Sequence, residues 1–497
     1  MMLITWHKFW PALSAVLYAM NMIIALYASI SMILRKQDPV KTLSWTAVMI
    51  LLPYLGIILY LTFGQNYRKS KLFSRKGVAD YRVRSELCEG EIEALEQIPE
   101  LLSPISEPYR KLIYQNLRNS HSLLDFNKDI EFYFNGKEAL DAMYKAIAEA
   151  KNHIHLQTYI LEDDSTGRRF VELLKTKAKE GVEVRIMYDA VGSSSLKKRF
   201  RKELQEAGIE VLVFSPVWFL MPMSKVNYRN HRKILVVDGI VGFLGGVNIA
   251  DRYYFGIDGK PWIDTQVKIT GESTYSLQYS FLLDRYFVQN RKIRLSKKYY
   301  PKIKTGNMHL KGEYQDVYTQ IISSGPDSDW AGIMQCFFTA ITSASSHIYI
   351  ETPYFTPNET ILNAIKVAAL GNIDVRLLIP EKGDSIAAHY CTRSYITELL
   401  EAGVKVYLFN KGFNHSKVIS ADGAISIVGS ANLDARSLEH NFEIMAVLYK
   451  KDCSAIVERQ FIQDLEYSTK IELEQWKKRP ASDKIKESFY RLLSPLM

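Results

Sequence analysis

Two long uncharged stretches dominate the hydrophobic pattern at the start of the chain. Residues 9–34 contain no charged side chain, a short polar turn follows, and residues 42–64 are again uncharged. At about 1.5 Å per residue, each stretch is long enough as a helix to cross a hydrocarbon core of about 30 Å. The pattern predicts a transmembrane helical hairpin over residues 1–66, with spans at 9–34 and 42–64. A signal peptide is the competing interpretation of the first stretch, but its apolar part exceeds the usual length of about 7–15 residues.

From residue 128 the pattern changes to amphipathic helices that alternate with short apolar strands. KEALDAMYKAIAEAKN at 137–152 has the helical period, and IHLQTYIL at 154–161 has the apolar run of a buried strand. The alternation recurs later, and LQEAGIEVLVF at 204–214 aligns directly with LLEAGVKVYLF at 399–409. The chain therefore predicts an α/β fold of two tandem lobes, each a mixed, mostly parallel sheet flanked by helices.

The expected boundaries follow the changes in pattern. The hairpin is followed by a polar, membrane-proximal linker, a first lobe, an inter-lobe linker, and a second lobe with a C-terminal tail; these cover residues 67–127, 128–295, 296–318 and 319–497. Two apolar segments keep open assignments. For PVWFLMPMSKVN at 216–227, the alternatives are packing between the lobes of the body, insertion into the membrane, or lining of an acyl channel. For the amphipathic tail at 482–497, the alternatives are docking on the body and docking on the membrane.

Composition adds a moderate positive charge. Lys and Arg total 63 against 54 Asp and Glu, a net charge of +9, which suits an anionic partner such as nucleic acid, anionic lipid or a phosphate substrate. The four cysteines are widely spaced without a CxxC pair, so neither a zinc site nor a disulfide framework is expected. Two spans return the chain to its starting side, where Lys8 and the basic residues at 68–76 outnumber those of the intervening turn at 35–41. This bias places the body in the cytoplasm.

One motif is written twice in the body. HRKILVVD at 231–238 and HSKVISAD at 415–422 each place a Lys two residues after a His and an Asp five residues after the Lys. Each runs into an apolar strand that ends in a turn with Gly and Asn, GGVN or GSAN. Two copies in equivalent contexts would bring two His and two Lys to one pocket.

This residue set suits phosphodiester exchange without a metal or other cofactor. A neutral imidazole can attack phosphorus, and a second, protonated imidazole can protonate the leaving alcohol. Lysines hold the phosphate as point charges, and amides at the Gly-containing turns donate further hydrogen bonds. The candidates are the histidines His231 and His415, the lysines Lys233 and Lys417, and the amides Asn248 and Asn432.

The paired motifs, with their followers GGVNIADRY and GSANLDARSLEHNFE, resemble the phospholipase D superfamily over residues 128–450. The segment at 35–64 is similar to the N-terminal segment of bacterial cardiolipin synthases. The resemblance implies transfer of a phosphatidyl group between two phosphatidylglycerol molecules, giving cardiolipin and glycerol through a phosphohistidine. It implies a membrane enzyme with an anionic phospholipid substrate, no nucleic acid partner and no metal, and leaves the oligomeric state open.

The resemblance also implies residue roles. His231 is the expected nucleophile and His415 the acid and base, although the internal symmetry leaves their order open. In the family an acidic residue downstream of each motif holds the far ring nitrogen of the motif's histidine, and Asp264 and Glu443 match these two positions. Asp238 and Asp422 complete the catalytic motifs and are expected to brace them. Tyr354 either lines the pocket or packs in the core.

Other functions remain open on the residues alone. The same centre could use water as acceptor, as a phospholipase D-type hydrolase does, or another alcohol. A nucleic-acid phosphodiesterase would use the same motifs, but the apolar N-terminus argues against it. A non-enzymatic membrane scaffold is disfavoured because both motifs are intact.

Overall fold

The computed structural model describes residues 2–35, 39–64, 79–214, 228–289, 297–301, 317–492 and 494. The chain divides into an N-terminal unit of residues 1–72 with 217–228, and a body of residues 73–216 with 229–497. The apolar insertion at 216–227, whose placement the sequence left open, lies outside the described residues.

The N-terminal unit contains one long helix and a broken second segment. Helix α1 (Met2–Leu34) includes Leu13–Leu34, which among the described residues is the one helix long and apolar enough to cross a membrane. The second apolar stretch differs from the continuous span expected over 42–64. It forms α2 (Pro39–Leu51), α3 (Leu55–Leu59) and the π-helical turn η1 (Tyr60–Gly64). Pro53 lies at the break, where it lacks the N–H that would continue a helix.

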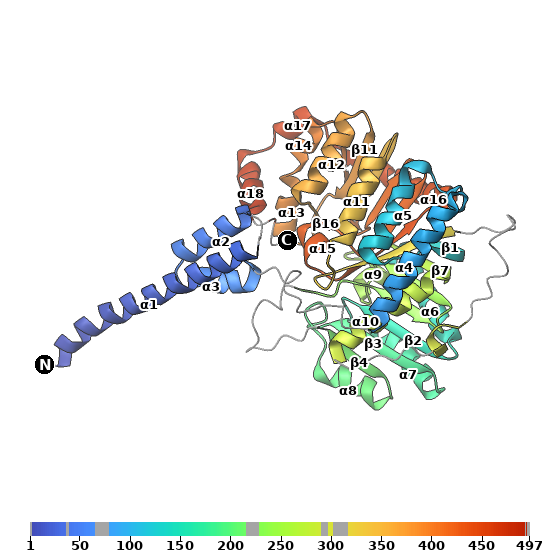
Figure 1. The fold of residues 1–497 in the computed structure, drawn as a ribbon, viewed down its shortest axis with the longest axis horizontal. Helices are drawn as coiled ribbons and strands as arrows, with labels where there is room; N and C mark the ends of the chain where they lie inside the picture. Colours follow the sequence, from blue (N-terminus) through green and yellow to red (C-terminus); the bar gives the residue numbers. More distant parts are fainter. Residues whose placement is uncertain are drawn as a thin grey trace. The chain divides into compact units, whose positions relative to one another are not determined.

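Sixteen of the described strands of the body form one sheet that contains both lobes (Figure 1). One of the sixteen, β13 (Phe413–Asn414), lies off the linear strand order, and β10 (Phe355–Thr356) and β16 (Leu433–Asp434) form a separate two-stranded sheet. The first lobe runs, from the centre of the sheet outward, β1 (Asp125–Asn135), β7 (Trp262–Gly271), β6 (Val241–Gly245), β5 (Ile234–Val237), β2 (His153–Thr158), β3 (Glu183–Asp189), β4 (Glu210–Phe214). The second lobe repeats this order as β8 (Val317–Ser324), β17 (Glu443–Leu448), β15 (Ile425–Gly429), β14 (Val418–Ala421), β9 (His347–Glu351), β11 (Asp374–Pro380), β12 (Lys405–Phe409), and adds β18 (Ser468–Lys470). Antiparallel pairing of β1 with β8 joins the lobes, so the predicted duplication is present within one continuous sheet.

The expectation of mostly parallel sheets is wrong. The outer strands β2–β3–β4 and β9–β11–β12 are parallel, but β5–β6–β7 and β14–β15–β17 are antiparallel meanders. The physical reason is the Asp-Gly pair that closes each motif. Asp238 and Gly239 have φ of 56° and 70°, and Asp422 and Gly423 have 56° and 59°. Left-handed backbone at both central positions makes the tight turn that connects antiparallel strands.

Part of the expected linker at 67–127 belongs to the folded body. It contains α4 (Ala79–Gln97) and α5 (Glu107–Ser120). The apolar side chains of α5, at Tyr109, Leu112 and Ile113, are fully buried in the same core as α11 (Gly332–Ser343). Helix α5 is amphipathic and buries this face at helical spacing, so a polar overall composition concealed a core element.

The C-terminal tail also docks on the body. Helix α18 (Ala481–Arg491) lies against α13 (Ile386–Arg393), where Tyr490 stacks on Tyr390 at 5.7 Å between ring centroids. Arg491 Nη2 donates to Glu398 at 2.5 Å. The opposite side of the helix leaves Ile485 and Phe489 exposed.

Candidate active site

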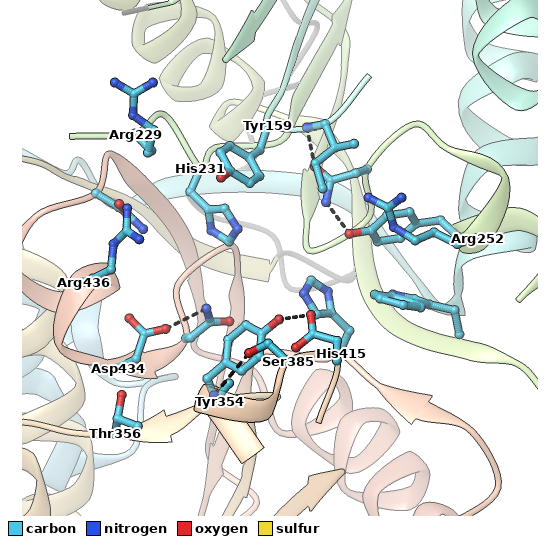
Figure 2. A pocket seen from close by; sticks show the side chains of 18 residues that line it. Tyr159, Arg229, His231, Arg252, Tyr354, Thr356, Ser385, His415, Asp434 and Arg436 are labelled. Carbon is cyan, nitrogen blue, oxygen red and sulfur yellow. Dashed lines mark hydrogen bonds between the residues drawn. The ribbon is translucent and has the colours of Figure 1, made fainter. Parts of the chain in front are cut away.

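The two motifs meet at one cavity of about 400 Å³ (Figure 2). His231 and Lys233 lie in the loop that enters β5, and His415 and Lys417 lie in the loop that enters β14. Since β5 and β14 occupy the same place in the two lobes, the duplication brings both histidines to the cavity wall, as the sequence predicted.

Each histidine is held by a carboxylate from the other lobe. His231 Nδ1 lies 3.1 Å from Glu443 Oε2, and Glu443 begins β17. His415 Nδ1 lies 2.7 Å from Asp264 Oδ2, and Asp264 is on β7. The family resemblance implied both carboxylates, but it paired each histidine with the one downstream of its own motif. That pairing is wrong, because in the structure each carboxylate contacts the histidine of the other lobe. Because Nδ1 is engaged in each ring, Nε2 is the nitrogen left for a substrate.

The environments of the two carboxylates differ. Burial raises the pKa of Asp264 to about 6, although the charges of Lys417 and Lys233 act to lower it. Burial also acts to raise the pKa of Glu443, but His231, Lys233 and a hydrogen bond from Ser430 together lower it. Glu443 is therefore the more firmly ionised partner. Burial lowers the pKa of both histidines, that of His415 well below its usual value.

The motif lysines are buried beside their own histidines. Lys233 Nζ donates to His231 O at 2.6 Å, and Lys417 Nζ lies 2.8 Å from His415 Nδ1 and also donates to His415 O. Burial lowers the pKa of Lys233 to about 7 and that of Lys417 to about 8. An anion in the cavity would favour the protonated amines, so phosphate binding and proton uptake are coupled here.

The two asparagines line the cavity as predicted, with different partners. Asn248 donates to Tyr253 OH at 2.6 Å and accepts from Ile160 N at 3.0 Å. Asn432 donates to Asp434 Oδ2 at 2.9 Å. Its buried Oδ1 has no hydrogen-bond partner within the described part of the chain.

The motif aspartates lie away from the cavity. Asp238 accepts hydrogen bonds from the backbone of Lys151, Asn152 and His153, ahead of β2. Asp422 accepts equivalent bonds from the backbone at 345–347 and one from Tyr109 OH. These contacts match the bracing role expected for both aspartates. Their place at the hairpin turns lets each carboxylate tie β5 or β14 to the next strand of the sheet.

Several cavity residues were not identified from the sequence. Tyr159 packs edge-on against His231 at 5.0 Å, and Trp262 contacts His415 at 5.3 Å between ring centroids. Arg252 and Arg436 also line the cavity. An available signal was the repeat itself, because GGVNIADR and GSANLDAR place an Arg four residues after each Asn.

Of the two positions expected for Tyr354, the cavity wall and the core, the structure shows the cavity wall. Its hydroxyl donates to Asp384 Oδ2 at 2.5 Å. Across the residues with described positions, no group of three or more His, Cys, Asp and Glu side chains is arranged to hold a metal ion.

A mixed sheet with two His-x-Lys motifs at one cavity defines a phospholipase D-type protein. The family model "Cardiolipin synthase, PLD-like domain" matches residues 143–258 and 337–465, and "Phospholipase_D-nuclease N-terminal" matches residues 23–65. The chain is 40% identical over 470 residues to a cardiolipin synthase of a Geobacillus species, covering 93% of this chain and 90% of that protein. It is 35% identical over 489 residues to that of Oceanobacillus iheyensis, covering 98% and 100%.

Among solved structures, the phosphatidylserine synthase of Haemophilus influenzae matches with a TM-score of 0.58 at 16% identity, covering 78% of this chain and 99% of that one. At this identity the likeness concerns the fold. The sequence relatives carry the assignment: this chain belongs to the cardiolipin synthase family of phospholipase D-like proteins.

Proposed function

We propose that this protein is a phosphatidyltransferase that converts two molecules of phosphatidylglycerol into cardiolipin and glycerol. The observation that carries the proposal is the pair of histidines at one cavity, each held through Nδ1 by a buried carboxylate. The cardiolipin synthases that match this chain over most of its length supply the substrate class.

In the first step, His231 Nε2 attacks the phosphorus of one phosphatidylglycerol. The bond from phosphorus to the glycerol oxygen breaks. The bound phosphate anion favours the protonated form of His415 against the effect of burial, and His415 Nε2 gives its proton to the departing oxygen, so that glycerol leaves. Phosphatidyl-histidine remains. Lys233 and Lys417 oppose the charge on the non-bridging oxygens, and the Asn248 amide adds a hydrogen bond.

In the second step, the primary hydroxyl of another phosphatidylglycerol takes the place of the departed glycerol. His415, now neutral, removes its proton, and the oxygen attacks phosphorus. The bond to His231 breaks, which releases cardiolipin and restores both histidines to their starting protonation states. The exchange consumes no high-energy bond, so the reaction is reversible.

The carboxylate partners support His231 as the nucleophile. Attack through Nε2 leaves positive charge on the imidazole ring, and an ionised carboxylate at Nδ1 stabilises that charge. Glu443, whose pKa is lowered, is suited to this role. Asp264, with a pKa raised to about 6, holds a ring that gives and takes a proton.

We further propose that the body works at the cytoplasmic face of the membrane. The apolar helix Leu13–Leu34 supports membrane attachment. The basic residues that follow residue 64 support the cytoplasmic side, because positive charge near a span is retained there.

The test is mass-spectrometric lipid analysis of phosphatidylglycerol vesicles incubated with the purified full-length protein, with EDTA present. Cardiolipin and glycerol in equal amounts, both absent with His231→Ala, are expected. Phosphatidic acid in place of cardiolipin would make water the acceptor and the protein a hydrolase. No lipid change with wild type would contradict the proposal and direct the search to nucleic-acid substrates or a scaffold role.

A further inference from the structure

A second phosphate must be bound during this reaction. In cardiolipin the two phosphates are joined by one glycerol, so the acceptor lipid brings its own phosphate to within a few bonds of the reacting centre. In the proposed mechanism the transferred phosphate engages the two motif lysines and the Asn248 amide. If the proposed function holds, the cavity wall needs another cation for the acceptor.

Three arginines line the cavity, and two of them already face carboxylates. Arg229 Nη1 lies 3.3 Å from Asp189 Oδ1, and Arg252 Nη1 lies 2.7 Å from Glu162 Oε1. Arg436 forms no ion pair with any residue that the structure describes, and its buried Nε has no hydrogen-bond partner there. Its positive charge is therefore the one available to a new anion.

The repeat explains why Arg436 has no carboxylate partner among the described residues. The bridge between Leu161 and Ile249 in the first lobe corresponds to the pair Phe355 and Leu433 in the second. The residue after Leu161 is Glu162, and the residue after Phe355 is Thr356. The second lobe thus has a threonine where the first lobe has the carboxylate that neutralises Arg252.

Thr356 itself points to a ligand. Its side chain is 1% exposed and lines the cavity, yet among the described residues its Oγ1 has no hydrogen-bond partner. Figure 2 shows Thr356, Asp434 and Arg436 on one wall of the cavity. The Asp434 carboxylate on this wall is already hydrogen-bonded, because its two oxygens accept from Asn432 Nδ2 and Ser437 N. These two donors offset its repulsion of an anion. Within the described part of the chain, this leaves a guanidinium without a carboxylate partner and a hydroxyl without a hydrogen-bond partner.

We propose that Arg436 and Thr356 form the subsite for the phosphate of the acceptor phospholipid. Arg436 contributes the charge and a planar set of donors that matches a phosphate, and Thr356 contributes one hydroxyl. The two lobes then divide the work: the pair of Arg252 and Glu162 stays structural, and its counterpart in the second lobe binds lipid. This inference rests on the proposed function.

Two reactions of one protein test the subsite. Exchange of labelled glycerol into phosphatidylglycerol uses the covalent centre but an acceptor without phosphate, whereas cardiolipin formation also needs the acceptor phosphate. Arg436→Gln should lower the ratio of cardiolipin formation to glycerol exchange about 10- to 100-fold, the usual effect of losing a charged hydrogen bond. Thr356→Glu should do the same by pairing Arg436 as Glu162 pairs Arg252, and Thr356→Gln, its uncharged match, should lower the ratio less.

The exposed Arg201→Gln controls for loss of positive charge and should leave the ratio unchanged. If both reactions fall together in Arg436→Gln, the arginine serves the shared centre and the inference is wrong. An unchanged ratio in both Arg436→Gln and Thr356→Glu would also overturn it. If wild type exchanges glycerol but forms no cardiolipin, the proposed function fails before the subsite is tested.

The broken apolar segment at 39–64 supports a second, independent inference. Helices α1 and α2 run antiparallel, with Ser29 Oγ 2.8 Å from Thr46 Oγ1. After the break the chain turns back along α2. The Trp45 and Tyr60 rings meet at 5.9 Å, and a Cβ on Gly56 would lie 2.3 Å from Val48 O.

One buried polar side chain hydrogen-bonds to the backbone on both sides of the break. Asn21, 1% exposed in the middle of α1, donates to Met49 O at 3.2 Å and accepts from Tyr54 N at 2.8 Å. Asn21 precedes Leu34, the last residue of α1, by 13 residues, so the break lies about 20 Å along the helix from Leu34. This distance is less than the thickness of the hydrocarbon core, which is about 30 Å. In hydrocarbon, backbone groups freed at a helix break require partners from the protein itself, and Asn21 supplies two.

We infer that residues 39–64 form a re-entrant hairpin that enters and leaves the membrane on one face. The body then lies on the face of the turn at 35–41, across the membrane from the start of α1. The distribution of positive charge agrees with this topology. It would put Arg35, Lys36 and Lys41 on the cytoplasmic side together with the basic residues at 68–76, and Lys8 alone on the opposite side of the membrane. A two-span hairpin would instead leave three basic residues outside.

Single cysteines in the full-length protein distinguish the two topologies. The four native cysteines are buried, so a membrane-impermeant maleimide applied to intact cells reports introduced ones. Re-entry predicts labelling of Ile4→Cys and protection of Gln37→Cys until lysis. The body variant Glu149→Cys, at an exposed position, should be protected and serves as the reference. Labelling of Gln37→Cys together with protection of Ile4→Cys would overturn the inference in favour of two spans.

Discussion

The two lobes share one strand order and one motif but differ in the charges buried beneath it. Below the first motif, Arg232 Nη1 lies 2.5 Å from Asp284 Oδ1, and Gln157 Nε2 donates to Asp284 Oδ2 at 2.6 Å. In the second motif the residue between His and Lys is Ser416, and the strand residue equivalent to Gln157 is Glu351. An ion pair in one lobe is thus replaced by a buried carboxyl group in the other.

The same asymmetry reaches the cavity. His231 has an ionised partner in Glu443, and His415 has a partner in Asp264 whose pKa is raised to about 6. Arg252 is paired, and among described residues Arg436 has no carboxylate partner. A duplicated scaffold keeps its geometry because sheet register depends on local pattern, while a few buried charges are enough to give the two halves different chemistry.

The largest expected effect tests whether the two histidines differ at all. His231→Ala and His415→Ala should each lower cardiolipin formation by at least about 10⁴-fold, because covalent capture or leaving-group protonation fails. A phosphatidyl ester of p-nitrophenol separates these roles, since its leaving group needs no proton. His415→Ala should release p-nitrophenol in a burst, and His231→Ala should not. The opposite result would exchange the two roles, and equal bursts would remove the distinction between the lobes.

Next in size is the difference between the crossed carboxylates. Glu443→Gln should lower kcat about 10³-fold, because the ionised partner of the nucleophile is lost, whereas Asp264→Asn should lower it about 10- to 100-fold. Both changes keep the size of the side chain, and thermal unfolding of the variants controls for folding. Equal losses would mean that the carboxylates, and hence the lobes, contribute alike.

A smaller effect concerns pH. Lys233 and Lys417, with pKa values of about 7 and about 8, bind phosphate in their protonated forms. Raising the pH through these values removes the charge, so KM for phosphatidylglycerol should rise about tenfold between about pH 7 and 9.

On the acid side, protonation of Asp264 removes the acceptor of His415, so kcat should fall as pH drops through about 6. Asp264→Asn should abolish this acid limb and keep the alkaline rise in KM; an acid limb that survives the substitution would assign it to another group.

The sequence predicted the duplication and showed both His-x-Lys motifs because each is a local pattern. HRKILVVD and HSKVISAD fix residue types and spacing within eight positions, and the repeated helices and strands around them indicate two equivalent lobes. The Asp-Gly turns were also local signals, and reading them as hairpins would have corrected the expected parallel sheet.

The crossed pairing and the broken apolar segment were beyond such reasoning. His231 and Glu443 are 212 positions apart, and His415 and Asp264 are 151 apart. Spacing within one motif carries no information about a partner in the other lobe. Likewise, hydropathy over 42–64 measures apolar content, and the fold-back depends on Asn21 in a different helix.

The smallest effect probes the buried carboxyl of the second lobe. Burial, with Asp464 nearby, raises the pKa of Glu351 to about 8, above its unfolded value, so the folded state holds more protons between these two values. The free energy of unfolding should therefore fall as pH rises from about 4.5 to 8 and level off above. Glu351→Gln can keep the hydrogen bond from Asn414 and removes this titration, so its stability relative to wild type should grow across that window by about 1.4 kcal/mol for each unit by which the fold raises the pKa of Glu351. Denaturant unfolding at several pH values measures it, with the exposed Glu172→Gln as control. A constant difference across the window would mean that Glu351 is ionised in the fold, and that the two lobes are closer in buried charge than the comparison holds.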